Sequence, residues 1–228
     1  MEWTQADEKI KNDIVDFFDK DTTCWIEEKA KDIAKIMSYY RCAMMEIETK
    51  FKVLNIEYSL KNDRNPISSI KTRLKDMQSI RGKFERKSIK MSLEALEKEI
   101  NDIAGVRVIC SFPADVYEIA EALLKQDDVR LIEMKDYIKN PKPNGYRSLH
   151  IIVEIPIFLS AEKKLMKVEI QLRTIAMDFW ASLEHQLRYK KDVEFTEEMA
   201  HELMECASIS ATLDERMDKL RNSVGNNE

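Results

Sequence analysis

Glycine and proline are scarce in this chain of 228 residues, with 4 and 5 copies, and most of them lie between Asn65 and Gly145. Both residue types interrupt regular structure, so long helices are expected over much of the remaining chain. No apolar run reaches membrane-spanning length, and the first residues, MEWTQADEKIKND, are polar and acidic, unlike a secretory leader. A cytoplasmic protein is therefore expected.

Cysteines are few and scattered, at Cys24, Cys42, Cys110 and Cys206, with no CxxC pair and no histidine close in sequence. Reduced thiols are expected, and a structural zinc site is not. Hydrophobic residues make up 44% of the chain and charged residues 35%, which is typical of a globular protein. The length suits one substantial core, or one domain with a helical appendage.

The glycine-rich loops that bind phosphates are also missing, because neither GxxxxGK[ST] nor GxGxxG occurs. The three histidines, His150, His185 and His201, form no recognisable Ser/His/Asp arrangement. Any phosphate group would therefore have to be held by side chains.

Charge is distributed unevenly along the chain, whose net charge is −5. Residues 64–90 hold nine basic and two acidic residues, whereas residues 192–228 hold ten acidic and three basic residues. A concentrated basic segment in an acidic protein favours a defined anionic ligand. For the helical part of this basic segment, a solvated helix face remains an equal alternative.

Hydrophobic periodicity predicts an α+β fold with a mixed sheet of about five strands, flanked by N- and C-terminal helices. Two helices are expected up to Leu60, with an interruption near Asp19–Thr23. Strands and helices then alternate, and an amphipathic helix over 175–189 and an acidic helix over 196–222 close the chain. The predicted division is 1–63 for N-terminal helices, 64–191 for the core and 192–228 for the acidic helix.

Four of the predicted strands each carry one charged face, because side chains alternate with a period of two. The polar residues are Lys71, Arg73 and Lys75, then Arg107, then His150 and Glu154, and finally Glu169, Gln171 and Arg173. If these faces coincide, cations surround a few carboxylates, an arrangement that suits a polyphosphate with Mg²⁺. Asp102 and Glu169 are the best-placed metal ligands. The alternative is that each is an ordinary surface residue.

Several ordered motifs together resemble one family. They are TRLK, the basic helix around KFERK, DIAGVRVIC, NGYRSLH, VEIQLRT and AMDFWASLEHQLRYK, within residues 66–190. The chain resembles the synthetase domain of RelA/SpoT homologues, and more narrowly the small single-domain alarmone synthetases. The resemblance implies a fold like that of polymerase-β nucleotidyltransferases. It also implies Mg²⁺-dependent transfer of the ATP pyrophosphate group to the 3′-hydroxyl of GDP or GTP, giving ppGpp or pppGpp in the stringent response.

The resemblance assigns roles on the ATP side of the cleft. Arg73 and Arg107 would sandwich adenine, because a planar guanidinium stacks well on a base. The ATP phosphates would be held by Lys75, Lys83, Arg86 and Lys87. Asp102 and Glu169 would bind Mg²⁺, and Glu169 would also act as general base toward the 3′-hydroxyl.

On the GDP/GTP side, the resemblance implies that Tyr146 stacks on guanine. Lys142, Arg147 and His150 would lie near the phosphates, while Gln171 and Arg173 support the site. Asp178 would accept hydrogen bonds from guanine. Trp180 is expected to lock its helix against the sheet.

The resemblance also implies a homo-oligomer, a tetramer in many relatives, and regulation by RNA or pppGpp. An intramolecular bundle of the terminal helices is the alternative to the oligomer. A synthetase without hydrolase activity is expected, because no His-Asp dipeptide occurs. One alternative is a non-catalytic module that binds guanine nucleotides or RNA. Another is a nucleotidyltransferase of the same fold with a different product.

Overall fold

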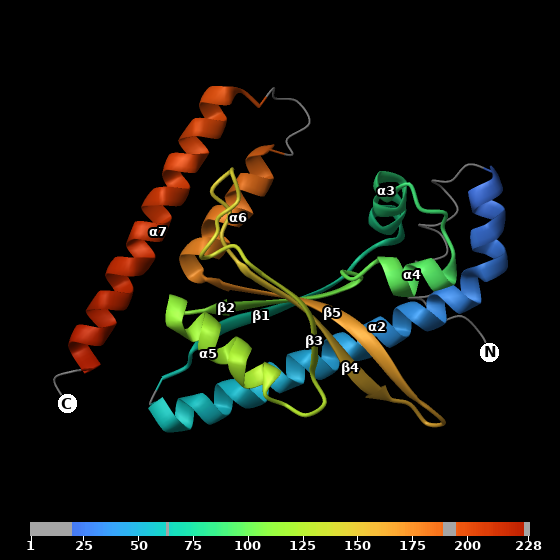
Figure 1. The fold of residues 1–228 in the computed structure, drawn as a ribbon, viewed down its shortest axis with the longest axis horizontal. Helices are drawn as coiled ribbons and strands as arrows, with labels where there is room; N and C mark the ends of the chain where they lie inside the picture. Colours follow the sequence, from blue (N-terminus) through green and yellow to red (C-terminus); the bar gives the residue numbers. More distant parts are fainter. Residues whose placement is uncertain (1–19, 63, 189–194, 226–228) are drawn as a thin grey trace.

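The computed structural model describes residues 20–62, 64–188 and 195–225, which form an α+β fold (Figure 1). In chain order the elements are α2 (Lys20–Asn62), β1 (Ile67–Leu74), α3 (Met77–Lys87), α4 (Leu93–Glu99), β2 (Ala104–Cys110), α5 (Pro113–Leu124), β3 (Arg130–Asp136), β4 (Leu149–Phe158), β5 (Lys163–Thr174), α6 (Ile175–Arg188) and α7 (Glu197–Gly225). The predicted class and the five strands are confirmed.

The strands form one mixed sheet in the order β1-β2-β5-β4-β3. The central pair, β2 and β5, is parallel, and the other neighbours are antiparallel. The faces of parallel strands are usually buried by other elements of the fold. β2 and β5 accordingly carry an apolar face that includes Val108, Ile170 and Leu172, all completely buried.

Helices α2 and α5 cover that apolar face. From α2, Tyr40, Ile47 and Phe51 enter the core. Burying a large apolar side chain contributes about 1.5–3 kcal/mol. Figure 1 shows α2 running along one side of the sheet, while α3 and α6 lie on the other side at opposite ends. The second face of the sheet is accessible, since Lys71 and Arg73 of β1 are exposed and Arg107 of β2 is partly exposed.

The helix boundaries differ from prediction at three places. The interruption expected near Asp19–Thr23 is wrong for Lys20–Thr23, which are helical in α2, because turn-forming residues are only a weak prior against helix. The predicted helix around KFERKSIK ends at Lys87, where Ser88 adopts the left-handed conformation with φ 54°. Helix α4 was not predicted; the Ser92 hydroxyl caps it by accepting from the Ala95 amide.

Residues 1–19 lie outside the described part, so the expected first helix stays a prediction. The proposed domain limits near residues 63 and 191 also stay predictions. Among the described helices, none is long and apolar enough to cross a membrane.

Candidate active site

Polar side chains form two rows across the accessible face of the sheet. Strand pairing aligns the first row through Lys71, Arg107, Gln171, His150 and Lys135, from β1 to β3. In the second row, Arg73 lies opposite Gly105, and Gly105 lies opposite Glu169. Paired residues project on the same side of a sheet. The predicted coincidence of the charged strand faces is therefore confirmed.

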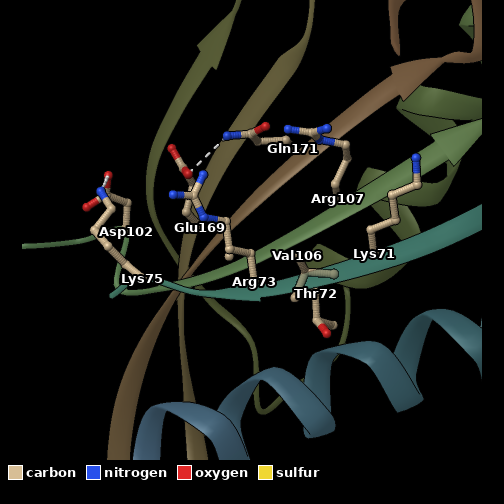
Figure 2. A pocket seen from close by; sticks show the side chains of 10 residues that line it. Lys71, Thr72, Arg73, Lys75, Asp102, Val106, Arg107, Glu169 and Gln171 are labelled. Carbon is tan, nitrogen blue, oxygen red and sulfur yellow. Dashed lines mark hydrogen bonds and ion pairs between the residues drawn. The ribbon is translucent and has the colours of Figure 1, made fainter. Parts of the chain in front are cut away.

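Residues of both rows on β1, β2 and β5 line a cavity of about 400 Å³ (Figure 2). Its lining residues are Lys71, Thr72, Arg73, Lys75, Asp102, Gly105, Val106, Arg107, Glu169 and Gln171. Gly105 has no side chain, so the floor between Arg73 and Glu169 stays open. A Cβ atom at Gly105 would lie 3.4 Å from the Arg73 carbonyl oxygen.

Asp102 precedes β2 and points into this cavity. Its Oδ2 atom lies 2.5 Å from Nζ of Lys75 and 2.8 Å from Nζ of Lys83. Burial raises the pKa of Asp102, but the two lysines outweigh burial and lower it below the ordinary 3.8. The Oδ1 atom is buried and has no hydrogen-bond partner among the described residues. Asp102 thus offers an ionised carboxylate with one unused oxygen.

Glu169 lines the same cavity from β5. Its Oε1 atom lies 3.6 Å from Nδ1 of His150, and its Oε2 atom accepts a 3.1 Å hydrogen bond from Nε2 of Gln171. Burial raises the pKa of Glu169, His150 lowers it, and the net result is a pKa below the ordinary 4.5. The charge of Asp102 opposes this lowering. Two ionised carboxylates that repel each other in one cavity form a donor set that fits a divalent cation.

Beside the carboxylates, Tyr146 lies among cations and a second aromatic ring. Its hydroxyl is 2.8 Å from Nε2 of His150 and accepts a hydrogen bond from Arg173. Nζ of Lys142 lies 4.9 Å from the centroid of the Tyr146 ring and 4.7 Å from that of Tyr137. These contacts fix the Tyr146 hydroxyl and ring next to His150, which in turn contacts Glu169.

Asp178 contacts both Arg107, assigned to ATP, and Arg173, assigned to support the GDP/GTP side. This carboxylate on α6 lies 3.4 Å from Nζ of Lys71, 3.3 Å from a terminal guanidinium nitrogen of Arg107 and 3.4 Å from one of Arg173. Its predicted guanine contact would therefore compete with three cations.

Other predicted residues lie further from the cavity. Lys87 donates to the Glu99 carbonyl oxygen at 2.8 Å, and Arg147 donates to the Ile138 carbonyl oxygen at 3.0 Å. Arg86 is exposed near the end of α3. Trp180, expected to lock α6 against the sheet, donates instead to the Leu203 carbonyl oxygen of α7 at 2.7 Å.

Two residues near the site were not predicted from the sequence: Lys135 in β3 and Tyr137 directly after it. Lys135 pairs with His150 in the register, and the Tyr137 ring lies 5.2 Å from that of His150 at 87°. Residues 129–138, VRLIEMKDYI, are one of the five predicted strands, so the strand itself was expected. The sequence did not show that this strand lies next to β4, because sheet order depends on distant parts of the chain.

A five-stranded mixed sheet with one face closed by helices, and the other presenting cations around two carboxylates, defines a nucleotidyltransferase-like fold and site. A family model described as "Region found in RelA / SpoT proteins" matches residues 72–194. The chain belongs to this RelA/SpoT family.

Among similar proteins, GTP pyrophosphokinase YwaC of Bacillus subtilis is 44% identical over 81% of this chain and 88% of its own length. The crystal structure of small alarmone synthetase 2 from B. subtilis matches with a TM-score of 0.76 and 44% identity, over 84% of this chain and 99% of that one. B. subtilis small alarmone synthetase 1 bound to its product pppGpp matches with a TM-score of 0.77 and 36% identity, over 85% and 98%. The predicted family is confirmed.

Proposed function

We propose that this chain is a GTP/GDP diphosphokinase that transfers the pyrophosphate group of ATP to the 3′-hydroxyl of GDP or GTP, making ppGpp or pppGpp. The observation that carries the proposal is the convergence of Asp102 and Glu169 in one cation-lined cavity, in a chain whose relatives are named GTP pyrophosphokinases. A structure of B. subtilis small alarmone synthetase 1 bound to AMPCPP, 31% identical with a TM-score of 0.72, supports an ATP site in this family.

ATP would bind toward β1, β2 and α3. Arg73 and Arg107, from neighbouring strands, would stack on adenine. Lys75 and Lys83 would hold the phosphates together with Arg86 and Lys87 on α3. Lys75 and Lys83 contact Asp102 in the structure. They would exchange that carboxylate for phosphate oxygens when the nucleotide binds.

Asp102 and Glu169 would hold Mg²⁺, since one oxygen of Asp102 is buried without a hydrogen-bond partner among the described residues and both carboxylates have lowered pKa values. Bound there, the ion would neutralise phosphate charge and orient the transferred group. The lysines and arginines around the cavity would add to this electrostatic stabilisation.

GDP or GTP would bind on the side of β4 and α6. Tyr146 would stack on guanine, with Lys142, His150 and Arg147 toward its phosphates. Asp178 would accept from the guanine N1–H and 2-amino groups after release from its cations. Gln171 and Arg173 would support the site, since each contacts a residue assigned to it.

The chemical step forms a bond between the acceptor 3′-oxygen and the β-phosphorus of ATP, and breaks the bond from the β-phosphorus to the oxygen that leaves with AMP. Glu169 would take the hydroxyl proton, since its lowered pKa keeps it ionised. His150, 3.6 Å from Glu169, would hold that carboxylate in place. Catalysis would otherwise consist mainly of positioning.

The test is incubation of the purified protein with ATP, GDP or GTP, and Mg²⁺, followed by chromatography. AMP together with ppGpp or pppGpp is expected, and release of pyrophosphate would indicate a different nucleotidyl transfer. The second candidate, a non-catalytic binder of guanine nucleotides or RNA, is favoured only by the basic surface. Binding without turnover would support it.

Hydrolase activity is not expected, so Mn²⁺-dependent release of pyrophosphate from ppGpp would contradict the proposal. The proposal also includes a cytoplasmic location, regulation by RNA or pppGpp, and assembly into a homotetramer. An apolar groove of about 670 Å³ between α6 and α7 supports the oligomer, because Phe179, Leu213 and Met217 in it are exposed. Light scattering of the wild type and of Phe179→Glu tests this; a monomer in both would contradict it.

A further inference from the structure

The helix α7 reaches the site through a buried carboxylate. Asp214 is 7% exposed, and its Oδ2 atom accepts a 2.5 Å hydrogen bond from the Thr174 hydroxyl. The same hydroxyl oxygen accepts from the Met177 amide at 3.1 Å, so it caps the first turn of α6. Asp214 thereby fixes the orientation of the group that starts α6.

That first turn carries residues assigned to the acceptor nucleotide. Arg173 directly precedes Thr174 and donates to the Tyr146 hydroxyl. Asp178 lies one turn further along α6 and is 3.4 Å from Arg173. A shift of the Thr174 hydroxyl would therefore move the residues around guanine.

A second contact of α7 holds the loop that carries Tyr146. Gly145 has a φ of 87°, and a Cβ atom there would lie 2.5 Å from the Cβ atom of Ala207 on α7. The loop backbone thus packs directly on α7. The residues assigned to ATP lie on β1, β2 and α3, and α3 is at the opposite end of the molecule from α7 (Figure 1).

Stability alone is a poor explanation for Asp214. Burial raises the pKa of this carboxyl, which means that burial disfavours its charged form. Ile175, Leu213 and Met217 line the same groove, where an apolar side chain would pack without that cost. The Thr174 hydrogen bond and the charge of Arg147 offset part of the cost. What a carboxylate adds at this position is a directed hydrogen-bond acceptor.

We propose that Asp214 is a positioning residue for the acceptor nucleotide, acting through the Thr174 hydroxyl on the start of α6. The proposal rests on the proposed function. It assigns to α7 the task of setting GDP or GTP affinity, while ATP affinity is set by the opposite side of the cavity.

The test compares Asp214→Leu, which removes the acceptor, with Asp214→Asn, which keeps a side-chain oxygen. Loss of an oriented buried hydrogen bond should raise the KM for GDP about tenfold in Asp214→Leu. The KM for ATP should change much less, by about twofold, because Asp178 reaches the ATP side only through its ion pair with Arg107. Asp214→Asn should restore most of the GDP affinity. Glu215→Leu, at an exposed neighbouring position on α7, is the matched control and should change neither KM.

Calorimetric titration of GDP and of a non-hydrolysable ATP analogue provides the same comparison without turnover. Absence of synthesis by the wild type would therefore refute the proposed function while the positioning role is still measured. Equal changes in both affinities, no change in either, or an Asp214→Asn protein as impaired as Asp214→Leu would overturn the proposal. If Asp214→Leu does not fold, Thr174→Val removes the donor and Thr174→Ser retains it, with the same outcomes expected.

Discussion

The guanidinium of Arg107 lies 3.3 Å from the carboxylate of Asp178. This ion pair connects the strand residue assigned to adenine with the helix residue assigned to guanine. Lys71 and Arg173 contact the same carboxylate. Binding of guanine by this carboxylate would draw it away from Arg107, so the two nucleotides should influence each other's binding.

Asp178→Asn should change the affinities for ATP and for GDP in opposite directions. Removing the charge frees Arg107, so affinity for ATP should rise about two- to fivefold. An amide oxygen accepts from guanine less strongly than a carboxylate, so affinity for GDP should fall about tenfold. Titration calorimetry with each nucleotide measures both changes. Weaker ATP binding in this variant would refute the proposed competition between Asp178 and adenine for Arg107.

Glu169→Gln and Asp102→Asn should each abolish synthesis while the fold survives. Each change removes a charged oxygen from the proposed metal site, and Glu169→Gln also removes the base, so kcat should fall at least about a hundredfold. Circular dichroism and gel filtration check the fold. Glu154→Gln, in the neighbouring strand and paired with Arg130, is the control and should remain active. Substantial turnover by Glu169→Gln would remove the role assigned to Glu169.

The lowered pKa of Glu169 predicts how the free energy of unfolding depends on pH. Because its pKa in the folded protein lies below the ordinary 4.5, the unfolded chain binds more protons in that interval. The stability that Glu169 contributes is therefore present above about pH 4.5 and lost as the pH falls through the folded pKa. Urea unfolding from pH 7 to 3 should show a weaker acid dependence for Glu169→Gln than for wild type. Parallel curves would contradict the lowered pKa.

Gly105→Val should obstruct the ATP side of the cavity. The new side chain would stand between Arg73 and Glu169 on the cavity floor, where only the glycine backbone lies now. The KM for ATP should rise at least about tenfold, with a small effect on stability because β-branched residues suit strands. Ser68→Val, at an exposed position of β1 outside the cavity lining, is the control. Unchanged ATP kinetics in Gly105→Val would place ATP elsewhere.

Much of the cavity could be predicted because strand periodicity is local. The alternation in KVEIQLRT puts Glu169, Gln171 and Arg173 on one face whatever the neighbouring strands are. The same argument placed Arg73 and Arg107, and the structure confirms that these charged faces coincide. The metal and nucleotide roles of these residues stay predictions.

The amino-acid sequence by itself determined the type of each element and the polar side of each strand, because both follow from neighbours a few residues apart. The tertiary structure decided which strands are adjacent, and so brought Gly105 beside Glu169 and Lys135 beside His150. It also decided that α7 returns to the site and places Asp214 against Thr174 across 40 residues of chain. Such contacts depend on how complete hydrophobic faces pack, which no local pattern encodes.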